Sequence, residues 1–250
     1  MSWWLAEQVI GGRVEVDAMD CWVTSSLVLG VSFTLVTAML TIFDLWSPPW
    51  WRATLLRSTK FPPTITLSRI STMMPTYFRN VVASGIYVWL LWNLRILVSE
   101  KPPSFILWID ANVWAPLSIF HQLLVIHCLS QLWFWCAHRY VHSVPALYKW
   151  IHAAHHAHTE PFALTAIDCT VSEMIVLNIP AVIFPLLLLK PSLLVQNIWV
   201  VLAALHVPLA HSSHSLRHLA DASHVIHHRD PRFNFGSTTL DRLFNTLKTE

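Results

Sequence analysis

The chain has 250 residues, of which 54% are hydrophobic and only 12% are charged. Soluble globular proteins carry roughly 25% charged residues, so this composition, with fourteen tryptophans and five glycines, indicates a membrane protein. The net charge is +2 and no stretch is dense in Lys and Arg, so nucleic acid is excluded as an expected partner.

Apolar stretches predict the first membrane helices. Residues 22–43 are apolar throughout and long enough to cross a bilayer, which takes about 20 residues. Residues 81–98 predict a second span, with Arg95 near one end, where its long side chain reaches the interface. Residues 105–137 are longer, and they predict an interfacial segment followed by one tilted helix that begins near Ala115.

Two further apolar runs, 174–189 and 192–210, are separated only by Lys190-Pro191 and predict a helical hairpin. The first run is short and interrupted by proline, so we expect it to enter the bilayer without crossing it squarely. Together the segments predict an all-α, polytopic integral membrane protein with about four to five transmembrane or hairpin helices.

The distribution of charge predicts the orientation. Residues 1–20 carry four acidic residues against one arginine, whereas the 44–80 loop carries five basic residues against Asp44. The positive-inside rule places this loop in the cytoplasm. Counting the spans onward then brings residue 138, residue 211 and the C-terminus to the same cytoplasmic face.

Histidines are concentrated in one part of the chain. Thirteen of the fifteen lie between His138 and His228, in groups spaced by three and four residues. His138 and His142 continue the third span at a spacing of four, so on a helix they share one face. The pattern His-x-x-His-His then occurs twice, and the topology brings these helical stretches to one membrane face. The eight histidines of these patterns are His138, His142, His152, His155, His156, His224, His227 and His228.

These imidazoles predict a metal site. Imidazole is the commonest neutral metal ligand and suits iron, zinc and copper. Eight or nine nitrogens exceed what one tetrahedral zinc ion uses, so their number favours two metal ions of higher coordination number. We expect His121 and His127, each isolated on an apolar helix, to be packed core or interfacial residues instead.

Other kinds of metal protein fit the sequence less well. A zinc-buffering loop has irregular histidine spacing, whereas this spacing repeats. A zinc metalloprotease is not indicated, because His-Glu-x-x-His does not occur. A transporter holds its ligands near the middle of the membrane, whereas these histidines follow the ends of the spans.

The sequence resembles the membrane-bound fatty acid hydroxylase/sterol desaturase superfamily over residues 135–166, 211–214 and 224–246. Its members show His-Arg-x-x-His, a Leu-Tyr ahead of His-x-x-His-His, and a late His-x-x-His-His. Asn-Tyr/Phe-Gly and Trp-Asp-Arg-Leu-Phe-Gly-Thr then follow. This chain matches the order and spacing, including Leu147-Tyr148 and Asn234-Phe235-Gly236.

The chain departs from the family pattern at a few positions. Leu240 stands where the family usually has Trp, and Asn245 where it has Gly. A His-Pro that many members carry ahead of the hairpin is absent from residues 168–173. No patterned histidine is lost, so these departures bear on substrate identity rather than on metal binding.

The resemblance implies a ninth ligand between the two His-x-x-His-His motifs. His211 matches that ligand best, with His206 and His214 as alternatives and His218 as a surface residue. Carboxylates often orient metal-bound imidazoles, and the candidates, which are equally suited to be helix caps or surface charges, are Asp168, Glu173, Asp221 and Asp230. We expect Asp241 and Arg242 to hold the C-terminal segment against the site.

The resemblance also implies a function. It implies two iron ions in a non-haem centre that uses O₂ to hydroxylate an unactivated C–H bond of a lipid or other hydrophobic substrate. The catalytic membrane domain would span residues 81–250, after an N-terminal segment, 1–80, with the first helix and the basic loop. The alternatives are a desaturase or related oxidative enzyme and, from another class, a non-enzymatic zinc-binding membrane protein.

Electrons must reach such a centre from elsewhere. The chain has no flavin or nicotinamide fingerprint, since its only adjacent glycines are Gly11-Gly12. We therefore expect an external NAD(P)H-linked donor, either a cytochrome b5-type carrier or a reductase. The expected location is the endoplasmic reticulum membrane, with the site facing the cytoplasm. Several substrate classes fit equally: sterols, fatty acids, sphingoid bases, carotenoids and secondary metabolites.

Overall fold

The computed structural model describes residues 9–10, 13–14, 18–56, 65–98, 115–214 and 223–249. Within these ranges the regular elements are helices, apart from a two-stranded ribbon of β1 (Val9–Ile10) and β2 (Arg13–Val14). The predicted all-α class is therefore confirmed.

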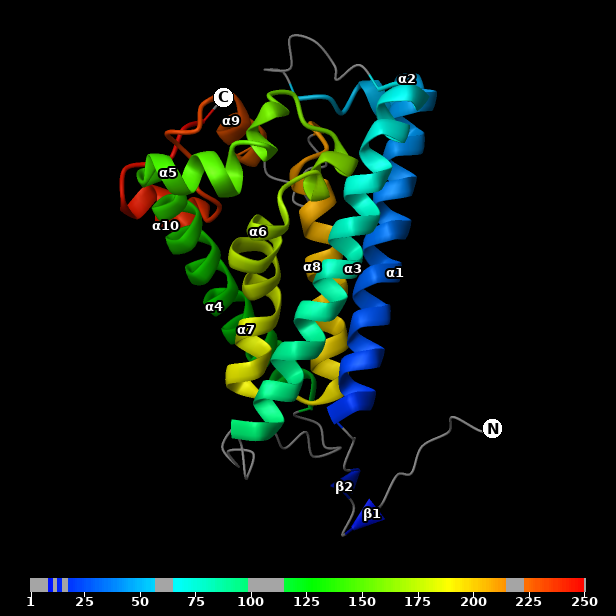
Figure 1. Ribbon diagram of the computed structural model, residues 1–250, viewed down its shortest axis with the longest axis vertical. Coiled ribbons are helices and arrows are strands. Elements are labelled where there is room, and N and C mark those ends of the chain that lie inside the picture. Colours follow the sequence, from blue (N-terminus) through cyan, green and yellow to red (C-terminus); the bar gives the residue numbers. More distant parts are fainter. Residues whose placement is uncertain are drawn as a thin grey trace.

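Five long helices run side by side along the length of the molecule (Figure 1). They are α1 (Ala18–Trp46), α3 (Leu67–Val98), α4 (Ala115–Ser143), α7 (Ile179–Leu189) and α8 (Leu193–Ala210). α1 packs along α8 and against α3, while α7 packs chiefly against α4. The first helix thus belongs to the same bundle as the histidine-bearing helices.

Four helical segments among the described residues are long and apolar enough to cross a membrane. They are Val23–Trp46, Pro116–Ser143, Val171–Leu189 and Leu193–Ala210. These segments confirm the predicted span at 22–43, the helix expected to begin near Ala115 and the predicted hairpin. The interfacial segment expected ahead of Ala115 lies outside the described residues. Large apolar side chains on α4, such as Leu117, Phe120 and Leu124, are exposed, as on a helix that faces lipid.

The second predicted span forms the end of a longer helix. α3 begins at Leu67, so residues 44–80 are not a single loop, and Asp44 lies in α1. The prediction of a loop was wrong because a helix cap and a buried side chain stabilise a helix ahead of residue 81. Thr66 accepts the backbone N–H of Arg69 at 3.1 Å as a cap, and Met73 is buried in the core.

The first arm of the hairpin is longer than expected. α6 (Val171–Glu173), a π-helical turn η4 (Met174–Asn178) and α7 follow one another without a break, and together they are long enough to cross a membrane. The expectation that this arm is too short to cross squarely was therefore wrong. The π turn lies directly ahead of Pro180, whose missing N–H removes one helical hydrogen bond. Lys190, in the left-handed conformation at φ 50°, ends α7.

Short elements gather at the upper end of the bundle (Figure 1). α2 (Pro49–Arg52) follows α1, and α5 (Pro145–Leu147) follows α4. The π-helical turn η1 (Tyr148–His152) and the 3₁₀ turns η2 (His155–Ala157) and η3 (Ala163–Ile167) come next. α9 (Ser223–Arg229) and α10 (Thr238–Leu243) complete this end.

Both histidine clusters, α2 and the C-terminal residues lie at this one end, whereas β1, β2 and the turn at Lys190 lie at the other (Figure 1). Both sets of histidines and the C-terminal residues therefore share one end of the bundle, as predicted. That this face is cytoplasmic stays a prediction.

The buried side chain of Asn80 on α3 supports the upper end from below. Its Nδ2 donates to the backbone oxygens of Ile167 at 2.8 Å and Cys169 at 3.0 Å. Arg79 donates to the same Cys169 oxygen at 2.6 Å. α3 thus holds the segment that includes η3, a contact that the sequence did not reveal.

The bundle predicts which positions share a membrane side. In a chain whose native cysteines are replaced, single cysteines at Arg52 and Arg232 should react together with an impermeant thiol reagent applied from one side. A cysteine at Lys190 should react only from the other side, because the bundle separates it from both by its full length. Labelling of all three from the same side would contradict this topology.

Candidate metal centre

Nine histidines converge at the upper end of the bundle in two adjacent groups. The first group contains His138, His142, His152, His156 and His227, and the second contains His155, His211, His224 and His228. Within each group the candidate ligand nitrogens lie within 4.8 Å of one another. These are the nine histidines proposed from the sequence, and the structure brings all nine together.

Each His-x-x-His-His motif contributes to both groups. His155 and His156 are neighbours in η2, yet they belong to different groups, and so do His227 and His228 in α9. Their rings lie 6.1 Å and 6.3 Å apart. The ring of His156 is 4.9 Å from that of His228, so the two groups touch. A doublet of histidines is therefore the sequence feature that serves two adjacent sites.

The first His-x-x-His-His motif, residues 152–156, does not lie on an α-helix, although we expected helical stretches for all the histidine patterns. His152 ends the π-helical turn η1, and His155 and His156 lie in the 3₁₀ turn η2. π-Helical turns are rare and occur often at functional sites.

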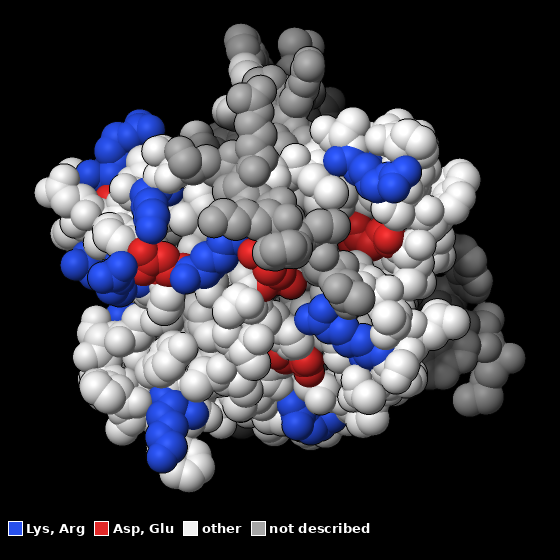
Figure 2. Space-filling view, turned by 90° about the horizontal axis from the view of Figure 1, so that it is seen from above, with Lys and Arg blue, Asp and Glu red and all other residues white. Residues whose placement is uncertain are grey.

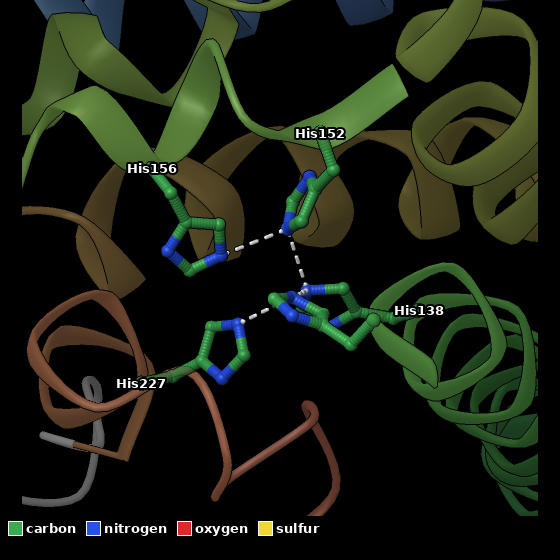
Figure 3. A group of neighbouring side chains, drawn as sticks. His138, His152, His156 and His227 are labelled. Carbon is green, nitrogen blue, oxygen red and sulfur yellow. Dashed lines mark hydrogen bonds between the residues drawn. The ribbon is translucent and has the colours of Figure 1, made fainter. Parts of the chain in front are cut away.

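The nitrogens of the first group are spaced as ligands of one metal ion. Nε2 of His152 lies 2.8 Å from Nε2 of His138 and 3.0 Å from Nε2 of His156. Nε2 of His142 lies 3.2 Å from that of His138 and 3.1 Å from that of His227. Figure 3 shows these rings pointing toward a common centre.

The second group has the same spacing. Nε2 of His211 lies 3.1 Å from Nε2 of His155 and 3.0 Å from Nε2 of His224. Nitrogens this close together can share one metal ion. The first group offers five nitrogens, which is more than one tetrahedral zinc ion uses.

Backbone carbonyls hold several of these rings from behind. Nδ1 of His138 donates to the oxygen of Phe235 at 2.8 Å, and Nδ1 of His227 donates to that of Phe233 at 2.6 Å. Nδ1 of His211 donates to the oxygen of Val207 at 2.8 Å. A neutral imidazole with its proton on Nδ1 carries a lone pair on Nε2. These rings therefore present lone pairs to the centre of their group, as metal ligands do.

Buried nitrogens of the second group have no hydrogen-bond partner within the described part of the chain. This holds for both ring nitrogens of His228 and for Nδ1 of His155. Buried polar atoms without partners are costly, and a metal ion would satisfy the ligating nitrogen of His228. The donor set therefore fits a metal pair.

Burial keeps the imidazoles neutral. It lowers the pKa of His211 to about 4 and, together with repulsion from His138, that of His156 to about 3. Burial first, and neighbouring imidazoles second, hold the pKa well below its usual range at His152, His155, His224, His227 and His228. At neutral pH a metal ion therefore displaces no proton from these ligands.

Three of the four candidate carboxylates are described, and one of these three reaches a grouped histidine. Oε2 of the buried Glu173 lies 2.9 Å from Nδ1 of His152. Asp168 instead contacts His158 at 2.8 Å, and Asp230 pairs with two basic side chains near the surface. Asp221 lies outside the described residues. Among the three, Glu173 is therefore the one placed behind a candidate ligand.

The remaining histidines lie outside both groups. His121 and His127 are exposed on α4, and His127 contacts Trp199 edge to face at 6.2 Å. His206 is exposed on α8, and His214 is buried elsewhere. His218 lies outside the described residues. Of the three candidates for a ninth ligand, only His211 joins a group.

The C-terminal segment closes over the first group, as predicted for Asp241. The buried Oδ1 of Asp241 accepts hydrogen bonds from Trp135 Nε1 at 2.9 Å, the Phe235 N–H at 3.1 Å and Thr246 Oγ1 at 2.7 Å. Phe235 is the residue whose carbonyl holds His138, so Asp241 connects α10 to a candidate ligand. Arg242 is exposed.

A second contact that the sequence did not reveal joins the two His-x-x-His-His motifs. Arg229, directly after His228, binds both carboxylate oxygens of Glu160 at 2.9 Å and 2.7 Å. Such a two-point pair fixes geometry as well as charge. Only the position of Arg229 beside a histidine motif hinted at this role.

Comparison with known proteins agrees with this site. Residues 123–246, about half of the chain, match the family model described as fatty acid hydroxylase, and this segment contains all nine histidines. The chain belongs to the fatty acid hydroxylase/sterol desaturase superfamily. No solved structure matches it.

Two members of the superfamily show how far the similarity extends. Fatty acid hydroxylase ahd1 of Mycosarcoma maydis is 25% identical over 98% of this chain and 63% of its own length. Methylsterol monooxygenase erg25B of Aspergillus fumigatus is 29% identical over 51% of this chain and 46% of its own length. The chain therefore spans less than two thirds of these relatives.

The structure explains two glycine positions of the superfamily pattern. Asn245, where the family has Gly, adopts the left-handed conformation at φ 56°, which asparagine tolerates better than most residues. Gly236 has φ 136°, and a Cβ there would lie 2.6 Å from the Phe134 ring. The first position thus accepts a substitute, whereas the second requires glycine.

Removing a ligand should release metal. Because His227 directs a lone pair into the first group, His227→Ala should lower the metal bound per purified chain by about one ion. His121→Ala is the matched control, since His121 is an exposed histidine outside both groups, and it should keep the wild-type content. Elemental analysis of both variants checks this, and equal metal content in the two would contradict the ligand assignment.

Gly236 should be intolerant of substitution. Gly236→Ala places a Cβ against the ring of Phe134. It also strains the backbone next to Phe235, whose carbonyl oxygen holds His138. The melting temperature in detergent should therefore fall. Gly85→Ala is the control, because Gly85 is a helical glycine with no atom within 4 Å of an added Cβ. That change should be neutral or stabilising, by up to about 1 kcal/mol. Similar melting temperatures for the two variants would refute the close approach at Gly236.

Proposed function

We propose that this protein is an O₂-dependent, non-haem di-iron oxygenase that hydroxylates an unactivated C–H bond of a lipid or other hydrophobic molecule. The observation that carries the proposal is the pair of imidazole groups with nitrogens 2.8 to 3.2 Å apart. Their number, five and four nitrogens, favours two metal ions of high coordination number. The superfamily supports the reaction class, since one relative is named a hydroxylase and another a monooxygenase.

The net reaction inserts one oxygen atom of O₂ into a C–H bond and reduces the other to water, which consumes two electrons and two protons. Two bound irons would supply the activation of O₂ and the cleavage of the C–H bond. The nine histidines would hold them, with five ligands from one group and four from the other. Backbone carbonyls and Glu173 keep the ligating rings oriented.

Aromatic side chains cover the first group. The Tyr148 ring lies 5.1 Å and the Phe235 ring 5.6 Å from the ring of His142, and Phe134 lies 4.9 Å from His138. These rings exclude water from one side of the site. Exclusion of water protects a strongly oxidising centre from side reactions.

A hydrophobic substrate fits the position of the site. His138 and His142 lie in the last turns of the candidate membrane span Pro116–Ser143. The site therefore lies where that span ends, close to the level of lipid headgroups. A molecule dissolved in the bilayer could present an alkyl group there without leaving the membrane.

The surface at the histidine end supports an external electron donor. Lys and Arg side chains are spread around the described part of this face, with fewer Asp and Glu between them (Figure 2). The exposed basic residues at this end include Arg52, Lys149, Arg232, Arg242 and Lys248. Such a face suits an acidic carrier of the cytochrome b5 type, fed by an NAD(P)H-linked reductase.

We further propose that residues 81–250 are the catalytic part, that residues 1–80 add the first helix and a basic segment, and that the site faces the cytoplasm from the endoplasmic reticulum membrane. The superfamily includes a sterol-modifying relative, which supports that location. The desaturase alternative needs the same centre. A tetrahedral zinc site uses four ligands, and the five histidines of the first group exceed that number.

Electron supply tests this function. The purified chain loaded with ferrous iron should form at most one product molecule per site with O₂ and lipid alone, because two ferrous ions hold only two electrons. Adding NADH, a reductase and a cytochrome b5-type carrier should start product formation. With ¹⁸O₂, label in the product supports a hydroxylase, and an unlabelled alkene supports a desaturase. Sustained turnover without a donor would contradict the mechanism.

A further inference from the structure

A second buried polar cluster lies beside the metal centre, where α1 ends. Its members are Asp44 in α1, Trp51 in α2, Thr54 and His214. Nε2 of His214 lies 2.9 Å from Oδ1 of Asp44, and Nδ1 of His214 lies 2.8 Å from Oγ1 of Thr54. The Trp51 ring stacks on His214 at 4.0 Å and donates its Nε1–H to the same Asp44 oxygen at 2.8 Å.

Both ring nitrogens of His214 are occupied within this cluster. The hydroxyl of Thr54 also donates to the backbone oxygen of Trp51 at 2.7 Å, so it links the ring to α2. With Nδ1 on Thr54 and Nε2 on Asp44, the ring has no nitrogen free to bind a metal ion.

The contacts of His214 fix the segment 211–214 together with two further hydrogen bonds. The backbone N–H of Leu56 donates to the oxygen of Ser213 at 3.1 Å, and the hydroxyl of Ser213 donates to the oxygen of Pro161 at 2.7 Å. Ser213 itself has a positive φ of 55°. His211, in the second imidazole group, begins the segment. The cluster thus ties a candidate ligand to α1 and α2.

We infer that His214 is not a metal ligand but a positioning residue, which together with Asp44 locks His211 in place for the second metal ion. The inference rests on the proposed metal centre and adds to it a structural dependence on α1. Neither nitrogen of His214 has a free lone pair, and the ring belongs to neither group.

Stability alone explains this cluster poorly. His214 and Asp44 have side chains only 3% and 6% exposed, and Oδ2 of Asp44 is buried without a hydrogen-bond partner among the described residues. A buried histidine–carboxylate pair with one oxygen left unsatisfied stabilises a fold little in comparison with apolar packing. Its contribution is a defined geometry for the chain between His211 and His214.

Metal titration of Asp44→Asn, His214→Gln and the double variant tests the inference, with ferrous iron as the probe and the full chain in detergent. His127→Gln is the matched control, because His127 lies outside this cluster and outside both imidazole groups. Each single variant should weaken binding of the second iron by about 10- to 100-fold, the usual effect of disturbing a residue behind a ligand. The first iron should remain, which shows that the variant is folded, and the double variant should be no worse than either single one.

Two results would overturn the inference. If His214→Gln lost one iron while Asp44→Asn kept both, His214 would be a ligand. If both single variants bound iron as the wild type does, the cluster would position nothing.

A measurement on the metal-free chain separates this inference from the proposed function. Nitrogen-15 NMR of histidine-labelled, metal-free protein should show that Asp44→Asn shifts the ring resonances of His211 as well as those that disappear in His214→Gln. Unchanged His211 resonances in Asp44→Asn would refute the positioning role whether or not iron binds. A wild-type chain that binds no iron would refute the proposed function and leave the structural tie between Asp44, His214 and His211 standing.

Discussion

The arrangement at the upper end of the bundle depends on the repulsion between imidazole lone pairs. His138 donates its Nδ1 proton to the Phe235 carbonyl, and its Nε2 faces that of His152 at 2.8 Å. Two lone pairs at that distance repel unless a cation lies between them. Three features hold the rings in this contact. They are the carbonyls behind the rings, the Asp241 contacts and the Arg229–Glu160 pair.

The bundle places this contact at the end of lipid-facing helices. α4 carries exposed apolar side chains along its length and then, in its last turns, His138 and His142. One helix therefore provides both the membrane span and the first two imidazoles of the site. α8 does the same for His211, which caps its C-terminal end. A centre built in this way can act on a molecule that stays in the bilayer, in line with the lipid-modifying relatives.

Much of this could be predicted from the sequence, because the signals are local. Runs of about 20 apolar residues define spans. The two His-x-x-His-His motifs identified six of the grouped histidines, the i, i+4 pair at the end of the third span identified His138 and His142, and the family resemblance identified His211. The start of α3 at Leu67 was not predicted, because the polar residues ahead of 81 resemble a loop in the sequence. They form a helix that packs through Met73. The roles of Asn80, Glu160 and the Phe235 carbonyl were also beyond prediction, since each depends on a partner far away in the sequence.

The central claim is that nine neutral imidazoles hold two iron ions side by side. X-ray absorption at the iron edge, on protein purified from iron-replete cells without added metal, tests it most directly. The account predicts about two irons per chain, with nitrogen neighbours at about 2.1 Å, imidazole multiple scattering and a second iron nearby. A protein that contains zinc alone, or isolated iron with mainly carboxylate or sulfur ligands, would contradict it.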